Sequence, residues 1–187
     1  VHAVLSIKYK VDQIISGTII NIFTIGLTSY IVTKILQERE WQYLNESGIF
    51  MPVSIPILSK IPYIGPILFN HNIFVYSMYI LVIVMTIALF QTRWGLRMRA
   101  VGEHPKAADT LGINVFRIRY VAVILGGMLA GFAGSYFSLG SAGYFNQSMT
   151  AGRGFIGLAA MIFGNWTPVG SFGAGLLFGF AESLATN

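Results

Sequence analysis

Few side chains in this sequence could catalyse the making or breaking of bonds. The 187 residues include no cysteine, and the three histidines, His2, His71 and His104, lie outside the long uncharged stretches. A nucleophile–base pair or a metal site within those stretches would need such residues there. The only carboxylate within the membrane segments predicted below is Glu182, near the end of the last one. The chain also lacks a Gly-x-x-x-x-Gly-Lys-Ser/Thr phosphate loop. We therefore expect no catalytic residue, no metal ion, no bound cofactor and no enzymatic activity.

A second kind of chemistry, the reversible binding of a polar solute, suits the polar side chains within the apolar stretches. Polar groups at membrane depth are costly and are often functional. Trp166 could in addition stack on a ring of the solute. The alternatives are hydrogen bonds between helices for the polar groups, a filling role beside Pro168 for Trp166, and an interfacial position or an acidic partner for Arg153. The candidates for a solute path are Gln13, Ser16, Asn21, Arg153, Phe155, Asn165 and Trp166.

Four stretches without a charged residue must position these side chains, namely 13–33, 73–91, 120–152 and 154–181. A bilayer core of about 30 Å needs about 20 helical residues to cross it, so each stretch is long enough. Only 10% of the residues are charged, whereas about 25% is usual in soluble domains. We predict an all-α fold, a single-domain polytopic transmembrane helix bundle over 1–187. The predicted spans are 13–35, 72–91 and 120–139.

The last apolar stretch, 153–182, is predicted to be a broken membrane segment. It is rich in glycine and carries Asn165-Trp-Thr-Pro168 near its middle. Discontinuous helices are tolerated at membrane depth where they are buried in protein or line a watery cavity. We expect two half-segments that meet near 164–170. The sequence leaves open whether the second half continues across the membrane or turns back.

Basic residues predict the orientation of the chain. The stretch 92–119 holds six Lys and Arg residues and two acids, a net charge of +4, whereas the longer stretch 34–72 holds only three basic residues. Lys and Arg accumulate in cytoplasmic loops. We therefore expect 92–119 to be cytoplasmic and 36–71 to be an extracytoplasmic loop. The net charge of +5 then reports orientation, and no nucleic-acid partner is expected.

Within the basic loop, two residues bound a short helix. Pro105 suits the first position of a helix, and Gly112 suits the position just after its end. Ala107, Ala108 and Leu111 lie between them and favour a helix or supply an apolar face. About seven residues are too few for a helix that is stable alone. The helix must pack on the rest of the protein or on a cytoplasmic partner, and the residue types leave both open.

Three stretches resemble one protein family. The run 92–115 resembles the cytoplasmic loop of permease subunits of ABC importers of the branched-chain amino acid, ribose and nucleoside group. The run 149–170, with Gly152-Arg-Gly-Phe155, resembles the broken segment of that family, and Asp12-Gln-Ile-Ile-Ser-Gly17 resembles the matching segment of its first half. These last two forms are most similar to bacterial nucleoside or simple-sugar permeases. The sequence departs from the family at His104, where Asn is common and is a better helix N-cap.

The resemblance implies a multi-pass permease of the bacterial inner membrane that forms the path for a nucleoside or a simple sugar. It implies an ABC ATPase subunit that uses ATP, a second permease subunit, identical or homologous, an extracytoplasmic substrate-binding protein and the lipid bilayer as partners. The loop 92–119 would be a cytoplasmic coupling loop whose short coupling helix lies in a cleft of the ATPase. The residues expected to serve this coupling are Gly102, Glu103, Pro105, Ala107, Ala108, Asp109, Leu111 and Gly112.

A rival interpretation is a secondary transporter or channel for a small polar solute. Such a protein would share the spans and the charge bias, but it would not need a short bounded helix in a basic inner loop. The ends of the sequence lead us to expect a fragment of a longer polytopic protein, because Val1 is not a start methionine and Asn187 follows an apolar run.

Overall fold

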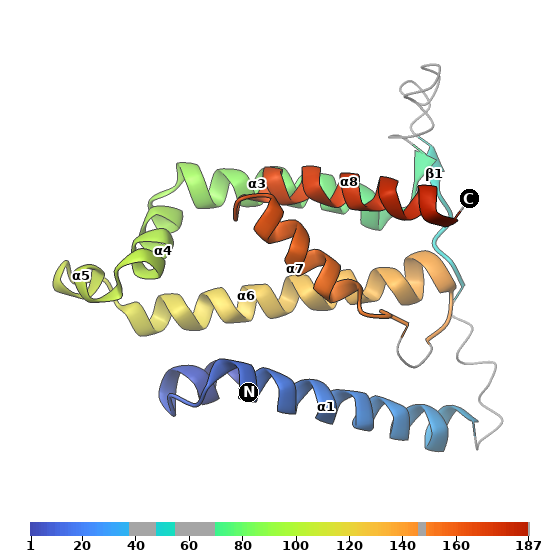
Figure 1. Cartoon of the computed structure of the whole chain (residues 1–187), viewed down its shortest axis with the longest axis horizontal. Coiled ribbons are helices and arrows are strands. Elements are labelled where there is room, and N and C mark those ends of the chain that lie inside the picture. Colours follow the sequence, from blue (N-terminus) through green and yellow to red (C-terminus); the bar gives the residue numbers. More distant parts are fainter. Residues whose placement is uncertain (38–47, 55–69, 146–148, 187) are drawn as a thin grey trace. The chain divides into compact units, whose positions relative to one another are not determined.

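The structure is a computed structural model that describes residues 1–37, 48–54, 70–145 and 149–186 (Figure 1). Most of the predicted outer loop, 38–47 and 55–69, lies outside the described residues. The chain divides into two compact units. The first unit comprises Val1–Met51 and Arg97–Met149, and the second comprises Pro52–Leu96 and Thr150–Asn187.

Two long helices dominate the first unit. Each continues at its C-terminal end into a π-helical segment, and the N-terminal π-helical turn η1 packs against both of them. The short helix α5 packs against α6. The elements are η1 (Val4–Lys8), α1 (Gln13–Ile31), η2 (Val32–Gln37), α5 (Pro105–Thr110), α6 (Val115–Ser135) and η4 (Tyr136–Ala142).

In the second unit, helix α8 packs against both α3 and α7. Tyr79 of α3 meets Phe172 of α8 edge to face, with ring centroids 5.9 Å apart, a favoured arrangement of aromatic rings. Helix α4 (Arg93–Glu103) begins in this unit and ends in the first. The other elements are β1 (Val53–Ser54), β2 (Asn70–His71), α3 (Ile73–Gln91), α7 (Arg153–Phe163) and α8 (Pro168–Thr186).

Three helical stretches are long and apolar enough to cross a membrane, namely Gln13–Lys34, Ile73–Gln91 and Val115–Ala142. Only 6%, 6% and 0% of their most apolar windows is buried within the chain, so their surfaces are left for lipid or for further protein. The 11 residues of α7 span about 16 Å, which is too short to cross a bilayer. The all-α, polytopic fold predicted from the sequence is confirmed.

Polar residues directly before the long helices determine where these begin. The Asp12 carboxylate accepts hydrogen bonds from the amides of Ile14 and Ile15 at 2.8 and 3.2 Å. Asn72 and Asn114 cap α3 and α6 in the same way, each accepting from the amide three residues further on. A cap of this kind contributes about 1 kcal/mol to helix stability. The polar groups at the ends of these apolar runs therefore have a structural function.

The described ends of the outer loop are tied to the start of α3. Strands β1 and β2 pair antiparallel, with Val53 opposite His71. The Tyr76 hydroxyl of α3 donates a hydrogen bond to the Val53 carbonyl at 2.8 Å. This short ribbon therefore lies beside the N-terminal end of α3.

The stretch 92–119 is more helical than predicted. The sequence suggested one short helix there, but the structure also contains α4, and α6 already begins at Val115. Arg117 and Arg119 thus lie on the first turns of α6. Their charges shift the apolar span toward the C-terminus, but arginine is a good helix former and does not end the helix.

Candidate functional site

Helix α5 ends in a Schellman motif. The Gly112 amide donates to the Asp109 carbonyl at 2.9 Å, and the Ile113 amide donates to the Ala108 carbonyl at 3.1 Å, which is the hydrogen-bond pair that defines this motif. Gly112 has φ +76°, a conformation that is strained for residues with a Cβ atom. Gly112 therefore lies just past the helix end, as its place in the sequence predicts, although α5 is six residues long rather than about seven.

A single residue, His104, joins α4 to α5. Its amide donates to the Ala100 carbonyl and its carbonyl accepts from the Ala108 amide, both at 3.0 Å. Proline disfavours the helical conformation in the residue before it, and His104 before Pro105 has φ −137° and ψ 83°. The His104 side chain makes no capping hydrogen bond. The weak cap expected from the departure at this position is observed.

The residues of α5 expected to contact an ATPase do not all share one accessible face. Ala108 is only 2% exposed and lies on the side of α5 that packs within the chain. The Ala108 side chain is therefore covered by its own chain in this structure, and its contact with an ATPase stays a prediction. Leu111 is 79% exposed, and Ala107 and Asp109 are exposed as well.

The other residues assigned to coupling flank this exposed surface. Gly102 and Glu103 form the exposed last turn of α4, and Pro105 is half-buried at the first position of α5. The accessible part of the coupling region is thus the end of α4 together with the outer side and C-terminal end of α5.

On α1, the three candidates for a solute path divide into two groups. Ser16 is 2% exposed, and its hydroxyl lies 3.1 Å from Nδ1 of His2. This contact joins α1 to the start of the chain and favours, for Ser16, the interhelical hydrogen bond that is the alternative to solute binding. Gln13 and Asn21 are exposed on this chain and stay candidates.

The break in the last segment is a tight turn that reverses the chain. A Cβ atom on Gly164 would overlap the backbone of Gly170, and the converse also holds. Between them, the Thr167 hydroxyl donates to the Gly164 carbonyl at 2.9 Å and accepts from the Gly170 amide at 3.1 Å. Pro168 then takes the first position of α8, where proline is favoured. The second half of the segment therefore turns back along the first, which the sequence had left open.

Asn165 and Trp166 form the tip of this α7–α8 hairpin. Their φ angles are 54° and 58°, in the left-handed region that is uncommon for residues other than glycine. Trp166 is 67% exposed. Both residues lie at the opposite end of α7 from Arg153, so the structure does not bring these three candidates together.

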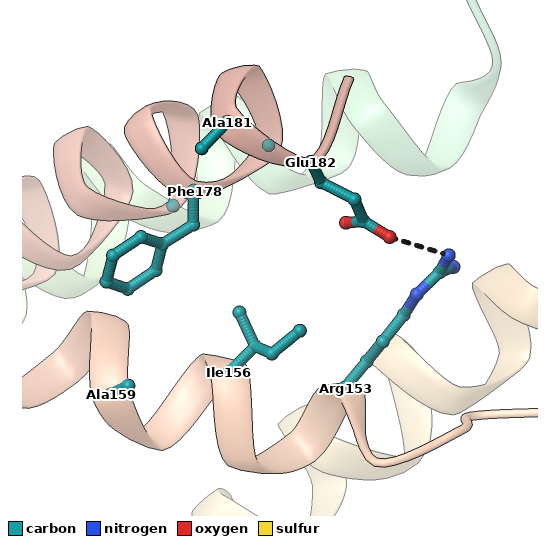
Figure 2. Close-up of a pocket in the computed structure, with 8 residues that line it drawn as sticks. Arg153, Ile156, Ala159, Phe178, Ala181 and Glu182 are labelled. Carbon is teal, nitrogen blue, oxygen red and sulfur yellow. Dashed lines mark hydrogen bonds and ion pairs between the residues drawn. The ribbon is translucent and has the colours of Figure 1, made fainter. Parts of the chain in front are cut away.

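A groove of about 590 Å³ lies between α7 and α8 (Figure 2). At one end, the Arg153 guanidinium donates to the Glu182 carboxylate over 3.2 Å. The two side chains are 50% and 53% exposed. The rest of the wall is apolar or consists of glycine: Ile156, Ala159, Gly175, Phe178, Gly179 and Ala181.

Of the four candidates in the last segment, only Arg153 lines this groove. Phe155 is 74% exposed and is not part of the wall. Glu182 was noted in the sequence only as a carboxylate near its end, but a stronger signal was present. Arg153 lies fourteen residues before Thr167, and Glu182 lies fourteen residues after Pro168. A segment that folds back at this point brings the two charges together.

Comparison with known proteins adds to this geometry. The chain is 42% identical, over 99% of its length, to the guanosine ABC transporter permease protein NupQ of Bacillus subtilis, and covers 58% of that protein. It is 41% identical, over 98% of its length, to the nucleoside ABC transporter permease protein NupC of Lactococcus lactis, and covers 57% of it. The putative glucose ABC transporter permease protein TsgC13 of Haloferax volcanii is 35% identical over 98% of the chain, which covers 55% of that relative.

The chain thus spans a little over half the length of the curated relatives it matches. No solved structure matches it. The family model described as the branched-chain amino acid transport system / permease component matches residues 1–187. With its three apolar helices of membrane-spanning length, this chain is a membrane protein and belongs to that permease family.

Proposed function

We propose that the protein containing this chain is the permease subunit of an ABC importer for nucleosides. The observation that carries the proposal is the likeness over almost the whole chain to two permeases whose names specify guanosine and nucleosides. The relative named for glucose is less similar, at 35% identity. A simple sugar is therefore the second candidate substrate.

The geometry supports a transport subunit in two ways. Three spans provide the membrane part, and the α7–α8 hairpin adds a groove with a pair of opposite charges. Helices α4 and α5 follow directly on a span, with only Thr92 between α3 and α4. A displacement of α5 by a partner would therefore be transmitted to the span α3 through two one-residue connections, His104 and Thr92.

The partners follow from the proposal. A separate ABC ATPase would hydrolyse ATP and hold α5, a second permease subunit would complete the path, and an extracytoplasmic binding protein would deliver the solute. The protein would lie in the inner membrane. The surplus of Lys and Arg in 92–119 supports a position of this stretch on the cytoplasmic side. The outer loop, 36–71, would then face the binding protein.

Uptake measurements test the proposal. The complete protein is produced in a host deficient in nucleoside uptake, together with an ABC ATPase and a binding protein from the same source organism. We expect concentrative uptake of labelled guanosine that is abolished when the phosphate-loop lysine of the ATPase is replaced. Unlabelled nucleosides should compete, and glucose should not.

Two results would contradict this assignment. Guanosine uptake that persists without a functional ATPase would indicate a secondary transporter or a channel. Uptake that glucose blocks and nucleosides do not would indicate a sugar importer.

A further inference from the structure

The α7–α8 groove combines features of a binding site for a small, partly apolar molecule. Binding sites for small molecules commonly occupy about 300–1,000 Å³, with apolar walls and a few fixed polar groups. The groove measures about 590 Å³. Ile156 and Phe178 face each other across it, whereas Arg153 and Glu182 form its polar end (Figure 2).

A purely structural ion pair accounts poorly for the position of these two charges. Both side chains are about half exposed, so the pair leaves part of each side chain accessible beside the groove. No other charged residue occurs between them, from Gly154 to Ala181. Charged groups within membrane segments are rare and usually mark a pathway or a functional site.

The glycines of the groove keep it open. A Cβ atom added to Gly175 or Gly179 would meet no atom within 4 Å. Neither glycine is therefore required for close packing against a neighbouring part of the chain. Their absent side chains instead contribute to the free volume beside Phe178.

We infer that this groove binds the purine base of a transported nucleoside, with Glu182 and Arg153 contacting the polar edge of the base. The inference rests on the proposed function. A guanine ring presents N–H donors beside a carbonyl acceptor. A carboxylate accepts from the N–H groups, and a guanidinium donates to the carbonyl oxygen and the adjacent ring nitrogen. The apolar faces of the ring would lie between Ile156 and Phe178.

The ion pair has a defined function in this arrangement. The opposite charges of Arg153 and Glu182 compensate each other, which lowers the free-energy cost of holding them at a membrane segment. A base with a donor and an acceptor side by side bridges the two groups and keeps both charges satisfied. A solute without such an edge, such as glucose, cannot replace the contact in the same way.

The first test fills the groove. In the complete protein, assembled with its ATPase and binding protein, Gly179→Leu should raise the KM for guanosine uptake at least tenfold. Gly173→Leu is the matched control, because Gly173 lies on the same helix, has no atom within 4 Å of an added Cβ and does not line the groove. The control should stay within twofold of the parent. Equal KM values for both variants, at equal membrane levels, would overturn the inference.

The second test separates recognition from a structural role. Glu182→Gln should raise the KM for guanosine about tenfold. It should change the KM for nebularine (purine riboside), whose base has no N–H donor for the carboxylate, less than twofold. The exchange Arg153→Glu with Glu182→Arg restores an ion pair of reversed direction. If the pair only joins the helices, the protein with the exchanged charges should match the parent both in its amount in the membrane and in guanosine uptake. If the pair binds the base, that protein should match the parent in its amount in the membrane but not in guanosine uptake.

Failure of this inference can be told apart from failure of the proposed function. A parent protein that takes up no nucleoside contradicts the proposed function itself. A parent that takes up guanosine, combined with a charge exchange that restores full uptake, contradicts only the groove.

Discussion

At the scale of single residues, the stability of the C-terminal end of α5 depends on the absence of a side chain at Gly112. Gly112→Ala puts a Cβ atom on a residue at φ +76° and should destabilise α5 by about 1 kcal/mol. Amide hydrogen exchange within 105–113, measured on the detergent-solubilised protein by mass spectrometry, should therefore accelerate about fivefold.

The control for this change lies one helix earlier. Gly102 is within α4, has open space around an added Cβ and has no positive φ. Gly102→Ala should slow exchange in α4, because alanine favours an exposed helix by about 1 kcal/mol over glycine. If both variants shift exchange in the same direction, the Schellman motif is not what ends α5.

At the scale of elements, Ala107 and Ala108 are neighbours on α5 with opposite environments. Ala107 is exposed and Ala108 is 2% exposed. Ala107→Arg should leave the amount of protein in the membrane unchanged and reduce ATP-dependent uptake about tenfold, because it adds bulk to the side available to the ATPase. Ala108→Arg should reduce the membrane level itself, since it forces a charge into a packed site.

Immunoblots of membranes, uptake rates and co-purification of the ATPase distinguish these effects. Normal uptake by the Ala107→Arg protein would show that α5 does not couple to an ATPase through this side. A normal membrane level for the Ala108→Arg protein would contradict the close packing of Ala108 within the chain.

The sequence predicted those elements whose signals are local. Uncharged runs identified the spans, and Pro105 and Gly112 bounded α5, because each signal depends only on nearby residues. Helix α4 escaped prediction because its arginines and its two glycines interrupt any apolar pattern, although most of its residues are good helix formers. The groove escaped because it depends on how the chain turns at Gly164 and Gly170. Two glycines permit this close backbone contact, but they do not by themselves specify the direction of the turn.

Local patterns also made some candidate residues ambiguous. The sequence made Ser16 a candidate for the solute path. Its hydrogen bond with His2, which joins two helical segments, is visible only in the structure. Arg153 was predicted as a candidate, but its partner Glu182 required the hairpin. The structure therefore added most for residues whose partners are distant in the sequence.

At the scale of the whole molecule, the orientation of the chain decides whether α5 can meet an ATPase at all. The ribbon of Val53 and His71 lies at the start of α3, and α4 follows its end. If α3 crosses the membrane, Met51 and Leu111 lie on opposite sides of it. Both are well exposed, at 84% and 79%, and the chain contains no cysteine, so each can be replaced by cysteine and labelled alone.

With any cysteines outside this chain replaced, a membrane-impermeant maleimide should label Met51→Cys in intact spheroplasts and Leu111→Cys only in inside-out vesicles. The six basic residues of 92–119 predict this orientation. The unsubstituted protein controls for background, and uptake by each variant shows that it still assembles. Labelling of Leu111→Cys from outside would place α5 in the extracytoplasmic space. There it could not contact a cytoplasmic ATPase, and the exposed side of α5 would have to be assigned to the binding protein instead.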